Sequence, residues 1–150
     1  MNDRIEKRIE ISAPISRVWL ALTDSRQFGE WFLVRINGPF SAGQPIGGQI
    51  THPGYEHVRL EIVIGMINPE TYFSFTWHPY AVDPKVDYST EEPTLVEFRL
   101  EPVAVGTLLT VTESGFEKVP AARRAEAFLR NDGGWAQQMK NIEAYVHKTI

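Results

Sequence analysis

The sequence contains no cysteine. This absence excludes a disulfide framework, cysteine-ligated zinc, iron–sulfur clusters and catalysis by a thiol. The chain also has no excess of positive charge, since 15 Lys and Arg residues stand against 19 Asp and Glu, a formal net charge of −4. Binding to the phosphates of DNA or RNA depends on clustered Lys and Arg, so nucleic acid is not an expected partner.

Long apolar runs are missing as well. The longest runs, residues 18–22 and 62–67, are far shorter than the roughly 20 residues that span a bilayer. The charged first eight residues contain no apolar segment of the kind found in signal peptides. We therefore expect no membrane insertion and a cytoplasmic location.

The common catalytic and metal-binding motifs are also absent. The glycine-rich residues 43–48 have no Lys-Ser/Thr behind them, so they do not form a phosphate loop. Neither Gly-x-Ser-x-Gly nor His-Glu-x-x-His occurs. His52 and His57 flank a turn, but Glu56 is the only further candidate ligand nearby, and we expect two exposed turn histidines. No metal and no cofactor are expected.

What is present fits a single domain over residues 1–150. Hydrophobic residues make up 43% and charged residues 23%, values typical of a folded globular protein. Residues 4–11 alternate as a strand does. Pro14 and the capping residues 23–25 predict the starts of two short helices, over about residues 15–22 and 26–32. Later strands are expected over residues 49–52, 58–67, 72–77, 94–101 and 107–116, with a weaker one near 33–37.

The strands alternate between an apolar face and a polar face that includes Ser74 and Thr112. An apolar sheet face needs a cover. The segment after Pro120 supplies one, because Trp135, Met139, Ile142 and Val146 fall on one helix face. The sequence thus predicts an α+β fold, in which a curved antiparallel sheet of about six to seven strands wraps around a long C-terminal helix.

Two features of this fold are left as alternatives. The pair Gly133-Gly134 either kinks one long helix or follows the start of a new one at residues 131–132, with helical structure on both sides. The longest connection, residues 79–93, is either a solvated hairpin loop, which we favour, or a lid.

Ten residues of the predicted apolar face are candidates for contact with a ligand. They are Trp31, Phe73, Phe75, Trp77, Phe98, Val111, Glu113, Trp135, Met139 and Ile142. The alternative, about as well supported, is that this aromatic stripe is simply packed core. Glu113 has the parity of Leu109 and Val111, so we expect its carboxyl group to face inward near one end of a cavity, where it is a weak candidate for a catalytic acid or base. The competing interpretation of Glu113 is a strand end in water.

Several short motifs follow one another in a specific order. They are Ala13-Pro14-Ile15-Ser16-Arg17-Val18-Trp19, Leu22-Thr23-Asp24, Glu30-Trp31-Phe32, Gly47-Gly48, Phe73-Ser74-Phe75-Thr76-Trp77, Thr112-Glu113-Ser114-Gly115-Phe116 and Gly133-Gly134-Trp135. In this order the chain resembles, over essentially its whole length, the START-like helix-grip (SRPBCC) superfamily, in particular the group like the C-terminal domain of the activator of Hsp90 ATPase. The resemblance implies a cavity for a hydrophobic or aromatic small molecule and transfers no catalytic triad.

Three functions follow as hypotheses. The first is a binding module that holds a hydrophobic or aromatic small molecule between the sheet and the C-terminal helix. The second is a cavity enzyme, similar to the cyclases, hydratases or hydrolases of the superfamily, with Glu113 as acid or base. The third and weakest is a chaperone-interacting protein, and a homodimer is a further option. The surroundings of Glu113 distinguish the first two, because a dry site with a polar group opposite the carboxylate favours chemistry.

Overall fold

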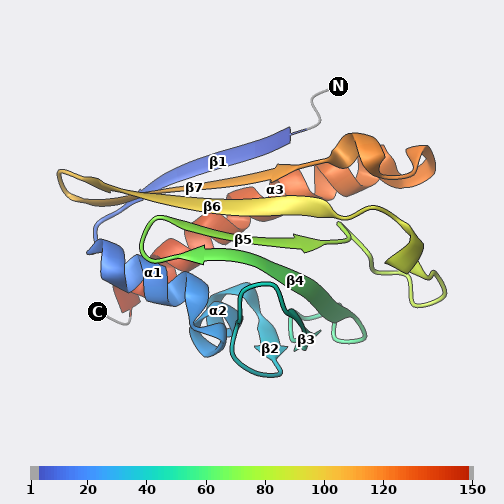
Figure 1. The fold of residues 1–150 in the computed structure, drawn as a ribbon, viewed down its shortest axis with the longest axis horizontal. Helices are drawn as coiled ribbons and strands as arrows, with labels where there is room; N and C mark the ends of the chain where they lie inside the picture. Colours follow the sequence, from blue (N-terminus) through green and yellow to red (C-terminus); the bar gives the residue numbers. More distant parts are fainter. Residues whose placement is uncertain (1–3, 149–150) are drawn as a thin grey trace.

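A computed structural model describes residues 4–148 of the chain. The strands and helices follow in the order β1 (Arg4–Ile11), α1 (Ile15–Thr23), α2 (Ser25–Phe32), β2 (Val34–Ile36), β3 (Pro45–Ile50), β4 (Arg59–Asn68), β5 (Tyr72–Trp77), η1 (Tyr88–Thr90), β6 (Thr94–Val103), β7 (Gly106–Ser114), η2 (Phe116–Lys118) and α3 (Ala121–Lys148). Figure 1 shows this order along the ribbon, with α3 running behind the sheet.

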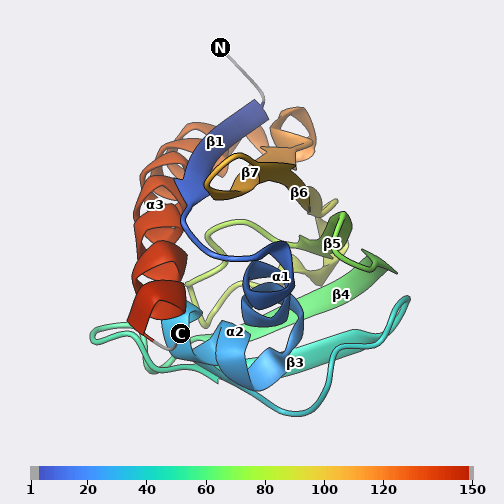
Figure 2. The ribbon, with the colours of Figure 1, turned by 90° about the vertical axis from the view of Figure 1, so that its left-hand side faces the viewer.

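The seven strands form one antiparallel sheet in the order β1-β7-β6-β5-β4-β3-β2. Except for β1, each strand therefore lies beside its neighbours in the chain, as expected of a meander joined by short turns. In the side view of Figure 2 the sheet curves, with α3 on one side of its concave face and α1 and α2 near the lower end. The predicted α+β helix-grip fold is confirmed.

The core lies where the concave face of the sheet meets the helices. Alternating strand residues supply Phe73, Phe75, Phe98 and Val111, each fully buried, and α3 supplies Trp135, Met139 and Ile142 at helical spacing. At about 25 cal/mol per Å² of apolar area, burial of this aromatic face is the main favourable term in folding.

The helices begin and end where the sequence indicates. Pro14 precedes α1, and the Asp24 carboxylate caps α2 by accepting a hydrogen bond of 3.0 Å from the Arg26 N–H. Helix α3 is continuous through Gly133 and Gly134, so the glycine pair neither kinks it visibly nor starts a new helix. Within residues 4–148, no helix combines the length and apolar character needed to cross a membrane.

Some predicted details are wrong. The strand expected at residues 49–52 is β3, Pro45–Ile50, because the histidine-flanked turn begins earlier than predicted. Strand β7 ends at Ser114 rather than at residue 116, since Gly115 adopts a left-handed φ of 97° and turns the chain. Ser74 and Thr112 lie on the outer face but are buried rather than wet. The Ser74 hydroxyl accepts from the Met66 N–H, beside an irregularity in β4.

The sheet opens between β4 and β5. Their pairing begins at Val63 opposite Thr76, so residues 59–62 of β4 pair with β3 alone. Beyond Trp77 the chain leaves the sheet as the connection 78–93, which returns at Thr94 in β6. The candidate site lies at this opening.

Candidate functional site

A buried carboxylate anchors the site. Glu113, near the end of β7, has no exposed surface, and its side chain accepts four hydrogen bonds from neutral donors. Trp77 Nε1 (2.7 Å) and Thr94 Oγ1 (2.6 Å) donate to Oε2, while Asn131 Nδ2 and Trp135 Nε1 (both 2.9 Å) donate to Oε1. The carboxylate therefore fixes side chains from β5, β6 and α3 around one point.

Three aromatic rings surround this point on the side away from β7. The indoles of Trp77 and Trp135 are stacked, with centroids 5.7 Å apart, and Phe32 at the end of α2 lies 6.0 and 6.2 Å from them. Because each indole N–H is engaged with Glu113, the two tryptophans present their π faces and not their polar atoms to the space beyond.

Three adjoining cavities occupy that space, and all three are lined by Phe32 and Asn131. Their volumes are about 380, 130 and 390 Å³. We call them together the interior cleft. It extends from the indoles, past the ends of β3 and β4, to the middle turns of α3 at Gly134 and Gln138.

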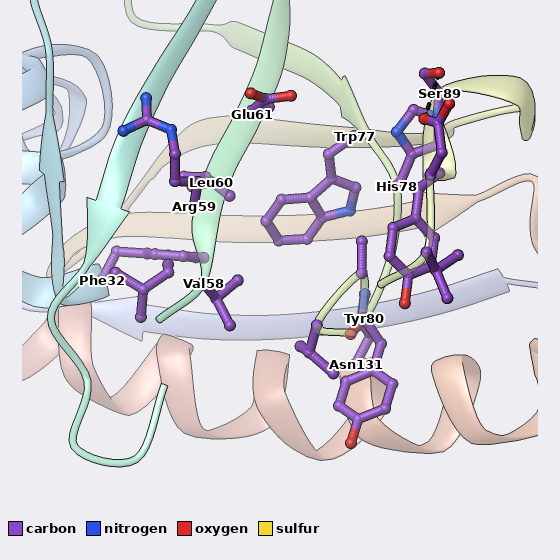
Figure 3. Close-up of a pocket in the computed structure, with 16 residues that line it drawn as sticks. Phe32, Val58, Arg59, Leu60, Glu61, Trp77, His78, Tyr80, Ser89 and Asn131 are labelled. Atoms are coloured by element: carbon purple, nitrogen blue, oxygen red, sulfur yellow. Dashed lines mark hydrogen bonds between the residues drawn. The ribbon is translucent and has the colours of Figure 1, made fainter. Parts of the chain in front are cut away.

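The largest part of the lining comes from β4 and from the connection after β5. Figure 3 shows the Trp77 indole between Val58 and the first residues of β4 on one side and His78 and Tyr80 on the other. Val58, Leu60, Val82 and Val86 add aliphatic surface, while Arg59, Glu61 and Asp87 add charged groups at the edge. The cleft thus combines aromatic and aliphatic walls with charged groups at the β4 edge and with polar side chains of α3, among them Asn131 and Gln138.

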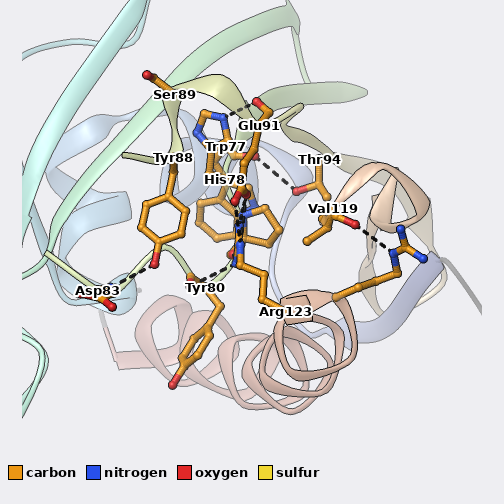
Figure 4. A network of polar contacts seen from close by, with 12 residues as sticks. Trp77, His78, Tyr80, Asp83, Tyr88, Ser89, Glu91, Thr94, Val119 and Arg123 are labelled. Carbon is orange, nitrogen blue, oxygen red and sulfur yellow. Dashed lines mark hydrogen bonds and ion pairs between the residues drawn. The ribbon is translucent and has the colours of Figure 1, made fainter. Parts of the chain in front are cut away.

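The connection 78–93 is fastened to α3 chiefly by Arg123. Arg123 donates to both carboxylate oxygens of Glu91, at 2.6 to 3.2 Å, and to the carbonyl oxygen of Pro79 at 2.7 Å. Its guanidinium carbon also lies 4.8 Å from the centre of the Tyr88 ring. Figure 4 shows these contacts converging on the connection from the α3 side. Arg130 of α3 adds a further contact, since its guanidinium carbon lies 5.2 Å from the centre of the Tyr80 ring.

The same connection carries local strain and local caps. Tyr80 has a φ of 50°, a left-handed conformation that a bulky residue rarely adopts. The Asp87 carboxylate accepts from the hydroxyl and the N–H of Ser89, and these bonds lower the pKa of Asp87 below its ordinary value. The segment therefore has hydrogen bonds of its own, while most of residues 83–93 are exposed, as in the solvated hairpin loop that we favoured from the sequence.

A fourth cavity, of about 460 Å³, lies on the other side of the sheet opening. It shares Arg59, Glu61, Trp77 and His78 with the 380 Å³ part of the interior cleft. Its further lining includes Gly47, Val63 and Thr76 of β3, β4 and β5. The opening between β4 and β5 is thus bordered by cavities on both faces.

The ten candidate ligand contacts fall into two groups. Trp77 and Trp135 line the interior cleft. Eight others are packed in the core or behind the indoles, each at most 4% exposed: Trp31, Phe73, Phe75, Phe98, Val111, Glu113, Met139 and Ile142. None of these eight lines the four cavities described here, and their contact with a ligand stays a prediction.

Several residues of the cleft were not candidates from the sequence. Phe32 directly follows the candidate Trp31 in α2. Asn131 precedes Trp135 by four residues, so the two side chains share one face of α3, and this spacing could have identified Asn131. Tyr80, Tyr88 and Arg123 have no such local signal, because their roles depend on where the connection folds back onto α3.

The arrangement favours binding over proton transfer by Glu113. Both of its oxygens are enclosed and engaged by donors, and Trp77, Asn131 and Trp135 separate them from the cleft. Across residues 4–148, no three His, Asp or Glu side chains are grouped closely enough to hold a metal ion.

Comparison with known proteins assigns a family. A family model described as Activator of Hsp90 ATPase homolog 1-like protein matches residues 12–147. No curated protein matches the chain in sequence.

Solved structures share the fold over nearly the whole chain. Protein MLL2253 from Mesorhizobium loti is 26% identical with a TM-score of 0.76, and 98% of each chain is covered. DynU16, a protein of the dynemicin biosynthetic locus, is 22% identical with a TM-score of 0.75, over 98% of this chain and 48% of that one. The Aha1 dimer of Colwellia psychrerythraea is 18% identical with a TM-score of 0.71, over 95% of both chains.

Proposed function

Because this chain belongs to the Activator of Hsp90 ATPase homolog 1-like family, with its helix-grip fold, we propose that it binds a hydrophobic or aromatic small molecule in the interior cleft. The observation that carries the proposal is the set of adjoining cavities walled by Phe32, Trp77 and Tyr80. Sites for small molecules commonly have volumes of about 300–1,000 Å³, apolar walls and a few polar groups. The largest parts of the cleft, at about 380 and 390 Å³, lie within this range.

Glu113 supports binding as a positioning residue. By holding the N–H groups of Trp77 and Trp135, the carboxylate turns both indoles so that their faces border the cleft. A general base needs a free lone pair within reach of the proton that it takes. The four donors around Glu113 occupy both oxygens, so we favour a binding module over an enzyme that uses this residue.

Two glycines of α3 offer a matched test. Gly134 lines two parts of the cleft, whereas Gly133, its neighbour, lines none of the four cavities, and a Cβ at either position meets open space. Gly134→Leu should fill the cleft and weaken binding of a hydrophobic fluorescent probe by about tenfold or more, while Gly133→Leu should not. Equal binding by both variants and the unchanged protein would place the probe elsewhere and count against the proposal.

A second candidate function rests on the family description. The matching family is named for activation of the Hsp90 ATPase, and the Colwellia relative is described as a dimer. We infer binding to an Hsp90-type chaperone and self-association as the alternative to small-molecule binding. Retention of purified Hsp90 by the immobilised protein, together with light scattering of the free protein, tests the two parts separately.

A further inference from the structure

The opening in the sheet leaves one strand edge unpaired inside a cavity. If the β4–β5 ladder continued beyond Val63 and Thr76, Glu61 would face His78 and Arg59 would face Tyr80. Tyr80, at a φ of 50°, leaves the extended conformation that the ladder requires and directs the chain away from β4. The sheet therefore separates here for a local reason.

The direction of the free backbone groups follows from the pairing with β3. Ile50 donates its N–H to Val58, and Ile64 donates its N–H to Gln44, so the even-numbered residues of β4 bond to β3. In an antiparallel ladder the residues between them point their N–H and C=O groups to the other side. At Arg59 and Glu61 that side is the opening.

Cavities meet this edge on both faces of the sheet. Arg59 and Glu61 line both the 380 Å³ part of the interior cleft and the cavity on the outer face, as do Trp77 and His78. In Figure 3 the Trp77 indole lies directly across from the β4 segment that carries Glu61. A π face and an unpaired N–H and C=O pair thus border the same space.

Building on the small-molecule binding proposed above, we propose that the ligand is a planar aromatic molecule with a lactam or imide edge. Its ring would lie against Trp77 and Phe32, while its C=O accepts from the Glu61 N–H and its N–H donates to the Glu61 carbonyl. A hydrocarbon or fatty acid cannot bond to both the N–H and the C=O of Glu61. A cis-amide edge offers one acceptor and one donor side by side, as a residue of a neighbouring strand does. An extended peptide has the same edge, but the flat aromatic lining and a volume of about 380 Å³ favour a compact ring system.

Three small probes of nearly the same shape test this proposal by calorimetry. They are 2-quinolone, which has the lactam edge, N-methyl-2-quinolone, in which the donor is blocked, and naphthalene, which has neither group. We expect 2-quinolone to bind about tenfold or more tightly than either control, because an unmade buried hydrogen bond costs affinity. In a ¹⁵N NMR titration the Glu61 amide should shift more with 2-quinolone than with naphthalene.

Two variants separate the contribution of the Glu61 backbone N–H to probe binding from that of the Glu61 side chain. Glu61→Pro removes the N–H that points into the opening and should lower the preference for 2-quinolone over naphthalene to about threefold or less. Glu61→Ala keeps the N–H and should retain the preference. Naphthalene binding by Glu61→Pro reports that the cleft has formed. If this variant does not fold, the affinity for N-methyl-2-quinolone and the shift of the Glu61 amide in the unchanged protein still test the lactam proposal.

The outcomes distinguish the two proposals. If all three probes bind equally well to the unchanged protein, the lactam proposal is overturned and small-molecule binding stands. If none binds and Gly134→Leu also leaves the hydrophobic probe unaffected, both proposals fail. If an extended peptide binds tightly and the protein shows no preference among the three probes, the aromatic lactam is the wrong ligand class and the edge binds a peptide strand.

Discussion

Glu113 is the residue on which the site is centred. Moving a carboxylate out of water is costly, and here no cation compensates it directly, because the four donors that surround it are neutral. Hydrogen bonds to a charged acceptor are stronger than those between neutral groups, so four of them offset much of this cost. The residue joins β7 to β5, β6 and α3 through its own side chain.

Replacing Glu113 with Gln should therefore be destabilising, although the two side chains have nearly the same shape. An amide NH₂ cannot accept, so one indole N–H, that of Trp77 or of Trp135, would face another donor, whereas the Thr94 hydroxyl or a turned Asn131 amide could accept from the new NH₂. We expect a loss of about 1–3 kcal/mol in the free energy of unfolding, from one buried indole N–H left without an acceptor. Urea unfolding measures it, with Glu101→Gln on the exposed end of β6 as the control.

A change below about 0.5 kcal/mol for Glu113→Gln, equal to that of the control, would mean that water or rearranged side chains satisfy the four donors. The inward direction of Glu113 could be predicted from its alternation with Leu109 and Val111. Its partners could not, because strand parity gives the face of a side chain but not which distant side chains meet it.

At the scale of elements, the connection 78–93 behaves as a wall held by Arg123. The exposed fractions of Arg123 and Glu91 are 20% and 13%, so water screens their ion pair only in part. The same guanidinium also binds the Pro79 carbonyl and lies over Tyr88, so its loss releases the connection at three points.

Arg123→Ala should loosen this wall without unfolding the sheet. Amide hydrogen exchange of residues 80–91 should become about 10–100-fold faster, the effect of losing roughly 1.4–2.8 kcal/mol of local stability. The neighbouring Arg124→Ala, which removes a single bond to the Val119 carbonyl, provides the control. Exchange that rises equally in both variants would show that α3 frays at its start and that the contacts of Arg123 have no special role.

The glycine pair in α3 allows a second test at this scale. Gly133 and Gly134 lie inside a continuous helix, and a Cβ at either position meets no atom within 4 Å. Since glycine costs a helix interior roughly 0.5–1 kcal/mol relative to alanine, Gly133→Ala and Gly134→Ala should each raise the free energy of unfolding by about that amount. A loss of stability in thermal unfolding would indicate that the helix needs a flexible point there.

Most elements could be predicted from local signals, and the site could not. Alternation located β5 correctly, and helical spacing identified Trp135, Met139 and Ile142 as the buried face of α3. Of the ten predicted ligand contacts, Trp77 and Trp135 line the described cavities, whereas the other eight side chains fill the core. The sheet opening depends on Tyr80 adopting a left-handed φ of 50°, a conformation for which a tyrosine in the sequence gives no local signal.

For the whole molecule, the cleft couples binding to stability. Its walls come from the end of α2, from β4, from the connection 78–93 and from the middle of α3, so unfolding destroys it. A ligand that binds only the folded chain stabilises it by about 2.7 kcal/mol at a free concentration of 100 times its Kd. The midpoint of thermal unfolding must then rise with ligand concentration.

For a chain of this length, that stabilisation corresponds to a rise of roughly 5–10 °C in Tm. We expect this shift for the unchanged protein with a ligand of the cleft, a comparable shift for Gly133→Leu, and a much smaller one for Gly134→Leu at the same concentration. Scanning calorimetry at several ligand concentrations provides the measurement. A shift of the same size in both variants would mean that the stabilising site lies outside the cleft, because only Gly134 borders it.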